Sequence, residues 1–180
     1  QGADLAFTEA QDGHGEPLRL HVDLLGRDVA IRAWVGCLGD IRLILLDTDL
    51  AENCAEDREI THHLYGGDEV YRLKQEIVLG IGGVRMLYAL GFNIKHYHLN
   101  EGHSALLTLD LLRRNAYAPE DLQAGEPLYD IPRVRDLCTF TTHTPVEAGH
   151  DKFSYDLVQR VLHNGIGIET FRKSTDPTNE

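Results

Sequence analysis

Hydrophobic and polar residues alternate along the first quarter of the chain. Apolar side chains recur at every second position in residues 18–25 and again in residues 29–35, which is typical of half-buried strands. Residues 41–46 form a nearly continuous apolar run, the pattern of a strand that is covered on both faces. Short polar turns separate the three segments, so we expect an antiparallel meander at the start of the fold.

A long helical pattern follows in the middle of the chain. From Glu69 the apolar positions recur at intervals of three and four, and Gly91 is a typical C-terminal stop, so we expect one long helix. A shorter helix that ends at Tyr65 precedes it. Glycine inside a helix costs about 1 kcal/mol relative to alanine. Three glycines within the long helix therefore predict a close approach of its backbone to a sheet or another helix: Gly80, Gly82 and Gly83.

The second half of the chain alternates between strand and helix patterns. We expect strands at 94–99 and 137–141, helices at 105–113 and 153–162, and mostly loop at 116–132. This alternation is typical of an α/β protein with a parallel sheet.

One domain accounts for most of the chain. Residues 1–17 are polar and contain several glycines, which predicts a flexible leader, and residues 166–180 predict a frayed tail. Residues 18–165 remain as a single domain, since no repeat and no internal boundary divides them.

Composition narrows the classes of function. The 180 residues carry 17 Lys and Arg against 29 Asp and Glu, a net charge of −12, which argues against nucleic acid or an anionic membrane as partner. No apolar run reaches the roughly 20 residues of a membrane-spanning helix. The three cysteines are widely spaced and form no CxxC pair, so we expect a reducing, cytoplasmic location and no disulfide framework.

Two polar segments, residues 96–103 and 141–145, follow predicted strands, where ligands bind in open α/β sheets. His103 falls in the first turn of the next predicted helix, whose positive dipole end favours a neutral imidazole. A neutral imidazole both donates and accepts a hydrogen bond, which suits a sugar hydroxyl. The alternative is that Asn100 only caps this helix and His103 only satisfies a loop carbonyl.

The histidines of the first segment also allow a metal hypothesis. His96 and His98 point the same way from a strand, and His103 could complete a catalytic zinc site. No cysteine ligand and no HExxH motif accompanies them.

The start of the long helix has two interpretations. Asp68 follows Gly66-Gly67 and either polarises a site from a loop or caps the helix. The charged residues at 69–76 predict a solvated helix face on which Arg72 pairs with Glu76.

Ordered motifs along the chain resemble the α-glucan (glycogen/maltodextrin) phosphorylase family. The similarity extends from about Leu18 to Leu162 and is strongest to the short bacterial and archaeal branch. The motifs that carry it are LDTDLAEN at 46–53, LYGGD at 64–68, YRLKQE at 71–76, LGIGGVR at 79–85, HLNEGHSA at 98–105 and FTTHTPVEAGHD at 140–151.

The resemblance implies a fold and a reaction. The fold is glycosyltransferase-B, with two Rossmann-like domains, of which this chain would be part of the N-terminal one. The reaction is the reversible phosphorolysis of α-1,4-glucans or maltooligosaccharides to glucose 1-phosphate. The family uses the phosphate group of pyridoxal phosphate, which is held as a Schiff base on a lysine of the second domain.

The resemblance also implies roles for individual residues. The family's counterpart of His103 contacts the glucosyl unit, and the counterpart of Asp68 lies on a gate loop, so these two are the predicted catalytic residues. The predicted sugar-binding residues are Asn100, Glu101, Gly102, His103, Thr142 and His143.

The family's glycine-rich phosphate-side loop, its pyridoxal lysine and its phosphate-binding basic residues have no counterpart in this sequence. We therefore expect the chain alone to be inactive, without bound cofactor or metal, and to self-associate through truncated surfaces. Two alternatives stay open. One is a non-catalytic half-domain that binds a carbohydrate or a partner, and the other is a metal hydrolase built on His96, His98 and His103.

Overall fold

The antiparallel meander predicted at the start of the chain is confirmed, although its third strand is not covered on both faces, because Ile41 and Leu45 are exposed. In this computed structural model, which describes residues 6–64, 66–123, 126–146 and 151–163, three strands follow one another through tight turns. They are β2 (Leu20–Leu24), β3 (Arg27–Leu38) and β4 (Ile41–Asp47). Leu25 and Gly26 link β2 to β3 and both have positive φ, as the twist of a two-residue hairpin requires.

Part of the predicted flexible leader is a strand. β1 (Phe7–Glu9) pairs antiparallel with residues 34–36 of β3, and Ala10 beside it is buried. A Cβ on Gly36 would lie 2.8 Å from the Phe7 ring, so the glycine makes room for this contact. Three residues are too few for a period-two pattern, which is why the sequence analysis missed the strand. Residues 1–5 and the predicted tail lie outside the described residues.

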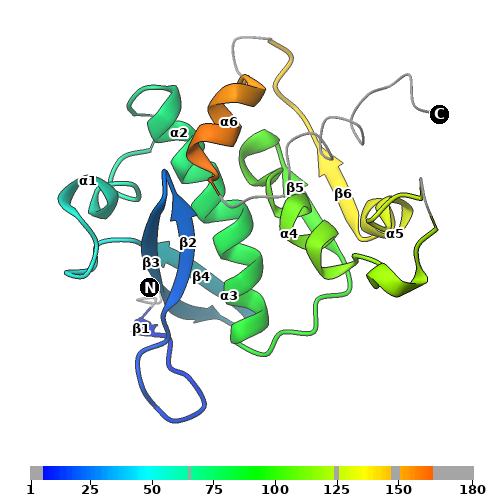
Figure 1. Cartoon of the computed structure of the whole chain (residues 1–180). Coiled ribbons are helices and arrows are strands. Elements are labelled where there is room, and N and C mark those ends of the chain that lie inside the picture. Colours follow the sequence, from blue (N-terminus) through cyan, green and yellow to red (C-terminus); the bar gives the residue numbers. More distant parts are fainter. Residues whose placement is uncertain (1–5, 65, 124–125, 147–150, 164–180) are drawn as a thin grey trace.

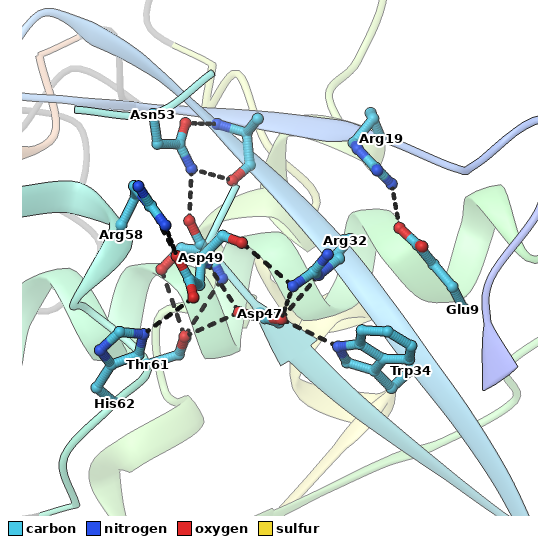
Figure 2. Close-up of polar contacts among 12 residues, drawn as sticks. Glu9, Arg19, Arg32, Trp34, Asp47, Asp49, Asn53, Arg58, Thr61 and His62 are labelled. Carbon is cyan, nitrogen blue, oxygen red and sulfur yellow. Dashed lines mark hydrogen bonds and ion pairs between the residues drawn. The ribbon is translucent and has the colours of Figure 1, made fainter. Parts of the chain in front are cut away.

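Where β4 no longer pairs with β3, the side chain of Asn53 forms hydrogen bonds with the β3 backbone in place of a neighbouring strand. Asn53 accepts a hydrogen bond from the Ala30 amide at 2.9 Å and donates to the Ala30 carbonyl at 2.8 Å (Figure 2). It also donates to the carbonyl of Thr48 at 2.8 Å. The buried amide therefore satisfies both backbone groups of Ala30 where β4 no longer reaches β3.

The short helix is shorter than predicted. α1 covers only Ala55–Arg58, and turns follow it, while the predicted end at Tyr65 lies outside the described residues. The side chain of Asp57 is drawn inward by Arg27, with contacts of 2.7 and 2.8 Å. This ion pair fixes α1 against the start of β3.

The predicted long helix is confirmed, with a change of pitch at its glycines. It consists of α2 (Glu69–Ile77), the π-helical turn η1 (Val78–Gly82) and α3 (Gly83–Ala89). A Cβ on Gly80 would lie 2.7 Å from the amide nitrogen of Leu107, and one on Gly82 would lie 2.8 Å from Ile31. The helix therefore approaches a second helix at Gly80 and the sheet at Gly82, as predicted, whereas a Cβ on Gly83 would meet only Leu46, at an ordinary 3.8 Å.

A parallel pair of strands forms the other half of the fold, in agreement with the predicted α/β alternation. Its strands are β5 (Tyr97–Asn100) and β6 (Cys138–Thr141). The remaining helices are η2 (Gly102–Ser104), α4 (Leu107–Arg114), η3 (Pro119–Asp121), α5 (Ile131–Asp136) and α6 (Tyr155–Val161), of which α6 packs against α2. Two expectations were wrong here. Asn100 belongs to β5 rather than capping α4, which begins after Leu106, and α5 was not predicted at all.

Two apolar clusters hold these layers together. One lies between the antiparallel sheet, the long helix and α6, and the other joins α3, α4, α5 and the parallel pair. Figure 1 shows the long helix between the antiparallel sheet and α4. The fold is thus mixed α/β, with an antiparallel sheet and a parallel pair. None of the helices described is both long and apolar enough to span a membrane.

Candidate functional site

Glu101 joins the carboxyl ends of the two parallel strands. It follows β5 directly, has a positive φ of 61°, and is 7% exposed. One carboxylate oxygen accepts hydrogen bonds from the amides of His143 and Thr144 at 2.8 and 3.0 Å and from the Thr144 hydroxyl at 2.9 Å. The other accepts from the Thr142 hydroxyl at 3.0 Å. These donors, the His143 amide first, lower the pKa of Glu101 to about 2.

Glu101 therefore holds the loop that follows β6. Through these hydrogen bonds Glu101 contacts two of the other predicted sugar-binding residues, Thr142 and His143. The His143 imidazole lies 3.4 Å from the Glu101 carboxylate and is 64% exposed, so it remains accessible to a ligand. The positive φ of Glu101, which is uncommon outside glycine, marks the point where the chain turns from β5 into η2.

His103 lies in a pocket of about 420 Å³ that opens between β4, α2 and η2. Its Nδ1 atom is 4.0 Å from a carboxylate oxygen of Glu76, and Asp151 lines the same pocket. The Arg72 guanidinium forms an ion pair with Asp151 at 3.0 Å. The pocket thus combines an imidazole, two carboxyl groups and a guanidinium with an apolar wall that includes Leu46.

Glu76 is the unusual group of this pocket. Burial raises its pKa to about 7, the negative charge of Asp151 adds to the rise, and Arg72 opposes it. The residue is 9% exposed, and within the described part of the chain its carboxylate accepts no hydrogen bond.

The predicted solvated face of the long helix was wrong. Lys74 and Glu76 are buried, and Arg72 forms its ion pair with Asp151 instead of Glu76. Glu76 lies three positions after Leu73, and Lys74 lies three before Ile77, so both share the apolar side of the helix. That spacing is the signal that could have revealed them.

A polar network supports one wall of the pocket. Asp47, at the end of β4, binds the Arg32 guanidinium at 2.7 Å and the Trp34 indole at 3.0 Å (Figure 2). Asp49 pairs with Arg58 at 2.7 Å. The Thr48 amide donates to the hydroxyl of Thr61, which lines the pocket, at 3.3 Å. The aspartates of the LDTDL motif therefore support the wall of the pocket and do not line it.

The remaining predicted residues lie apart from His103. The side chain of Asp68 caps α2 by accepting the Tyr71 amide at 2.9 Å, which is the structural one of its two interpretations. It does not line the pocket. Asn100 ends β5 with an exposed side chain, and Gly102 begins η2.

The three histidines of the metal hypothesis are not brought together. His96 and His98 each place Nε2 2.7 Å from a threonine hydroxyl of β6, those of Thr139 and Thr141. Among the residues that the structure describes, the one group of three or more ligand side chains close enough for a metal contains His103 with Glu76 and Asp151 instead. The zinc hydrolase built on His96, His98 and His103 is therefore wrong.

The described residues do not fit pyridoxal phosphate. The cofactor needs a lysine that can form a Schiff base beside a cationic phosphate site. Lys74, which is buried, pairs with Glu56 and Asp57, so an anionic phosphate would meet two carboxylates there. In a second pocket, of about 390 Å³, Arg85 is paired with Asp110 at 3.0 Å. No step through the cofactor follows from these residues.

The order of the motifs resembles a segment of the α-glucan phosphorylases, and comparison with known proteins confirms that resemblance. The chain is 44% identical over 148 residues to maltodextrin phosphorylase of Thermococcus litoralis, covering 82% of the chain and 17% of that protein. It is 39% identical over 164 residues to glycogen phosphorylase of Mycobacterium tuberculosis, covering 87% of the chain and 18% of that protein. Glycogen phosphorylase of Aquifex aeolicus is 30% identical over 152 residues.

The chain is therefore homologous to maltodextrin and glycogen phosphorylases, and it spans less than a quarter of the length of these relatives. No protein-family model matches the chain, and no solved structure matches it.

Proposed function

We propose that the chain is part of the N-terminal, Rossmann-like domain of an α-1,4-glucan phosphorylase with the glycosyltransferase-B fold. Its contribution to that enzyme is one wall of the site for the glucosyl unit. The observation that carries the proposal is the position of His103, which lies in η2 just after the parallel strand β5 and lines the 420 Å³ pocket with Glu76.

In the proposed reaction the parent enzyme transfers a glucosyl unit from the glucan to phosphate and forms glucose 1-phosphate. His103 binds a sugar hydroxyl, since its imidazole is 43% exposed toward the pocket. Glu101 positions the loop that carries Thr142 and His143, because its own carboxylate is occupied by the chain. Pyridoxal phosphate, which supplies the phosphate group for proton transfer in the family, is assigned to another part of the parent.

The pocket of this chain alone is only a partial site. We expect it to bind maltooligosaccharide weakly, with a dissociation constant on the order of 1 mM, and to release no glucose 1-phosphate. The polypeptide of this sequence is titrated with maltoheptaose while the histidine resonances are followed by NMR. The signal of His103 should shift as maltoheptaose is added. Binding should be lost in His103→Ala, whereas His21→Ala, which changes the second pocket, should leave the binding unchanged.

A chimera separates catalytic support from binding alone. The chain replaces the matching segment of the Thermococcus litoralis maltodextrin phosphorylase, and phosphorolysis is measured as glucose 1-phosphate. An active chimera whose kcat falls about 100-fold with His103→Ala supports the proposal. A folded but inactive chimera that still binds maltoheptaose supports the non-catalytic half-domain instead. An active chimera that tolerates His103→Ala overturns the role of the pocket.

Self-association is a separate part of the proposal. The apolar side chains of Ile41 and Leu45 on β4 are 62% and 51% exposed, a surface that a second copy of the chain could cover. Light scattering at rising protein concentration should show dimers or larger species. A strict monomer would contradict this part and leave the catalytic proposal untouched.

A further inference from the structure

We propose that Glu76, His103 and Asp151 form a binding site for a divalent transition-metal ion of the Zn²⁺ type. Each of the three offers one ligand atom, and the three atoms lie within 4.8 Å of one another. The three come from separate parts of the chain, α2, η2 and the segment before α6, so the fold and not the local sequence gathers them.

The ligand set matches the preferences of zinc. Imidazole and carboxylate groups bind Zn²⁺ at about 2.0–2.2 Å, and a site with three protein ligands keeps one position open. In a tetrahedral site this bond length separates the ligand atoms by about 3.3 Å. His103 Nδ1 and the Glu76 oxygen are 4.0 Å apart, so movements of about 1 Å, within the reach of side-chain torsions, would close the geometry.

Glu76 gives the second, independent indication of a ligand. Its side chain is only 11% exposed and lines the pocket, and none of the residues that the structure describes donates a hydrogen bond to it. A buried carboxyl group without a hydrogen-bond donor is costly unless a cation or a proton compensates it. A metal ion at the pocket would provide that compensation.

Arg72 does not prevent binding, although it is a cation beside the site. It contacts one carboxylate oxygen of Asp151 at 3.0 Å, which leaves the second oxygen for the metal. Carboxylates that ligate metals are commonly oriented by such an outer partner. Two carboxylates against one guanidinium keep the local charge negative, in line with the chain's net charge of −12.

The test is a titration of the metal-free chain with ZnCl₂ by calorimetry, with CoCl₂ as a spectroscopic probe of the coordination geometry. We expect one ion per chain at this site and visible Co²⁺ bands typical of tetrahedral coordination. His103→Asn, Glu76→Gln and Asp151→Asn should each weaken Zn²⁺ binding about tenfold or more. Asp151 is exposed, so Asp151→Asn keeps the test valid if a change at buried Glu76 disturbs folding.

His62→Asn is the matched control. His62 also lies near an aspartate, with 3.7 Å between its Nε2 and Asp49, but no third ligand joins the pair among the residues that the structure describes. Zinc affinity should stay within about twofold in this variant. Absence of zinc binding, or binding that survives both His103→Asn and Asp151→Asn, overturns the proposal. The titration contains no sugar, so its result is independent of the proposed phosphorylase function.

Discussion

Gly80 and Gly83 form a matched pair with opposite expected effects when each is replaced by alanine. Both lie in the long helix, where alanine is favoured over glycine by about 1 kcal/mol. A Cβ on Gly80 would lie 2.7 Å from the amide nitrogen of Leu107 and 3.1 Å from the carbonyl carbon of Leu106, both backbone atoms. A Cβ on Gly83 would meet only the Leu46 side chain, at an ordinary 3.8 Å.

The magnitudes follow from these contacts. Gly83→Ala should stabilise the fold by about 0.5–1 kcal/mol, because it gains helix propensity without a clash. Overpacking costs about 1–3 kcal/mol, and backbone neighbours cannot rotate away, so after the propensity gain of about 1 kcal/mol Gly80→Ala should lose up to about 2 kcal/mol net. The two variants should therefore differ by up to about 3 kcal/mol in the free energy of unfolding, or several degrees in Tm.

Urea unfolding of the two variants and the wild type measures the difference. Gly80→Ala should also shift the NMR signal of His103, since the displaced Leu106 follows η2 closely in the chain, whereas Gly83→Ala should not. If Gly80→Ala proves as stable as Gly83→Ala, the helix does not touch α4 as described, and the reasoning fails.

Three further predictions concern buried charges. Glu76 has its pKa raised to about 7, so the stability that its protonated carboxyl group contributes is complete below the ordinary pKa of 4.5 and is lost as the pH rises through 7. Between about pH 5 and pH 8, Glu76→Gln, measured with chelator present, should therefore lose less stability than the wild type. Glu101 has its pKa lowered to about 2, so its contribution is lost as the pH falls below about 4.5; acid unfolding of Glu101→Gln should depend less on pH in that range. Asp57→Asn leaves buried Lys74 without one of its two carboxylates and should cost about 3–5 kcal/mol in urea unfolding.

Each of these predictions has its own contradicting result. Parallel pH profiles for the wild type and either glutamine variant would show that the carboxyl group titrates normally in the fold. An Asp57→Asn protein within about 1 kcal/mol of the wild type would show that the ion pair contributes little beyond its desolvation cost.

Strong periodicity is what made the main elements predictable. The meander and the long helix repeat their apolar spacing over many residues, and Gly80 and Gly82, though not Gly83, correctly indicated where that helix touches its neighbours. α5 was missed because Pro132 was interpreted as a loop residue, although proline is common in the first turn of a helix and Asp130 caps this one.

The candidate site was only partly predictable. His103 follows a parallel strand, and that position is visible in the sequence. Glu76 and Asp151 are separated by 75 positions, and their meeting depends on how α2 packs against the sheet and where the segment before α6 returns. Charge on a helix suggests solvent exposure, and only the tertiary packing shows that this carboxyl group is buried.

The amide of Asn53 has a consequence for how this protein meets other chains. An uncovered strand invites a neighbouring molecule to add its own strand by backbone pairing. At Ala30 an intruding strand would find no free donor or acceptor, because one side chain already occupies both. Asn53→Asp would keep the acceptor for the Ala30 amide but remove the donor, so the Ala30 carbonyl would lose its hydrogen-bond partner. The Asn53 side chain thus leaves no backbone group of Ala30 free to pair with a strand of another molecule.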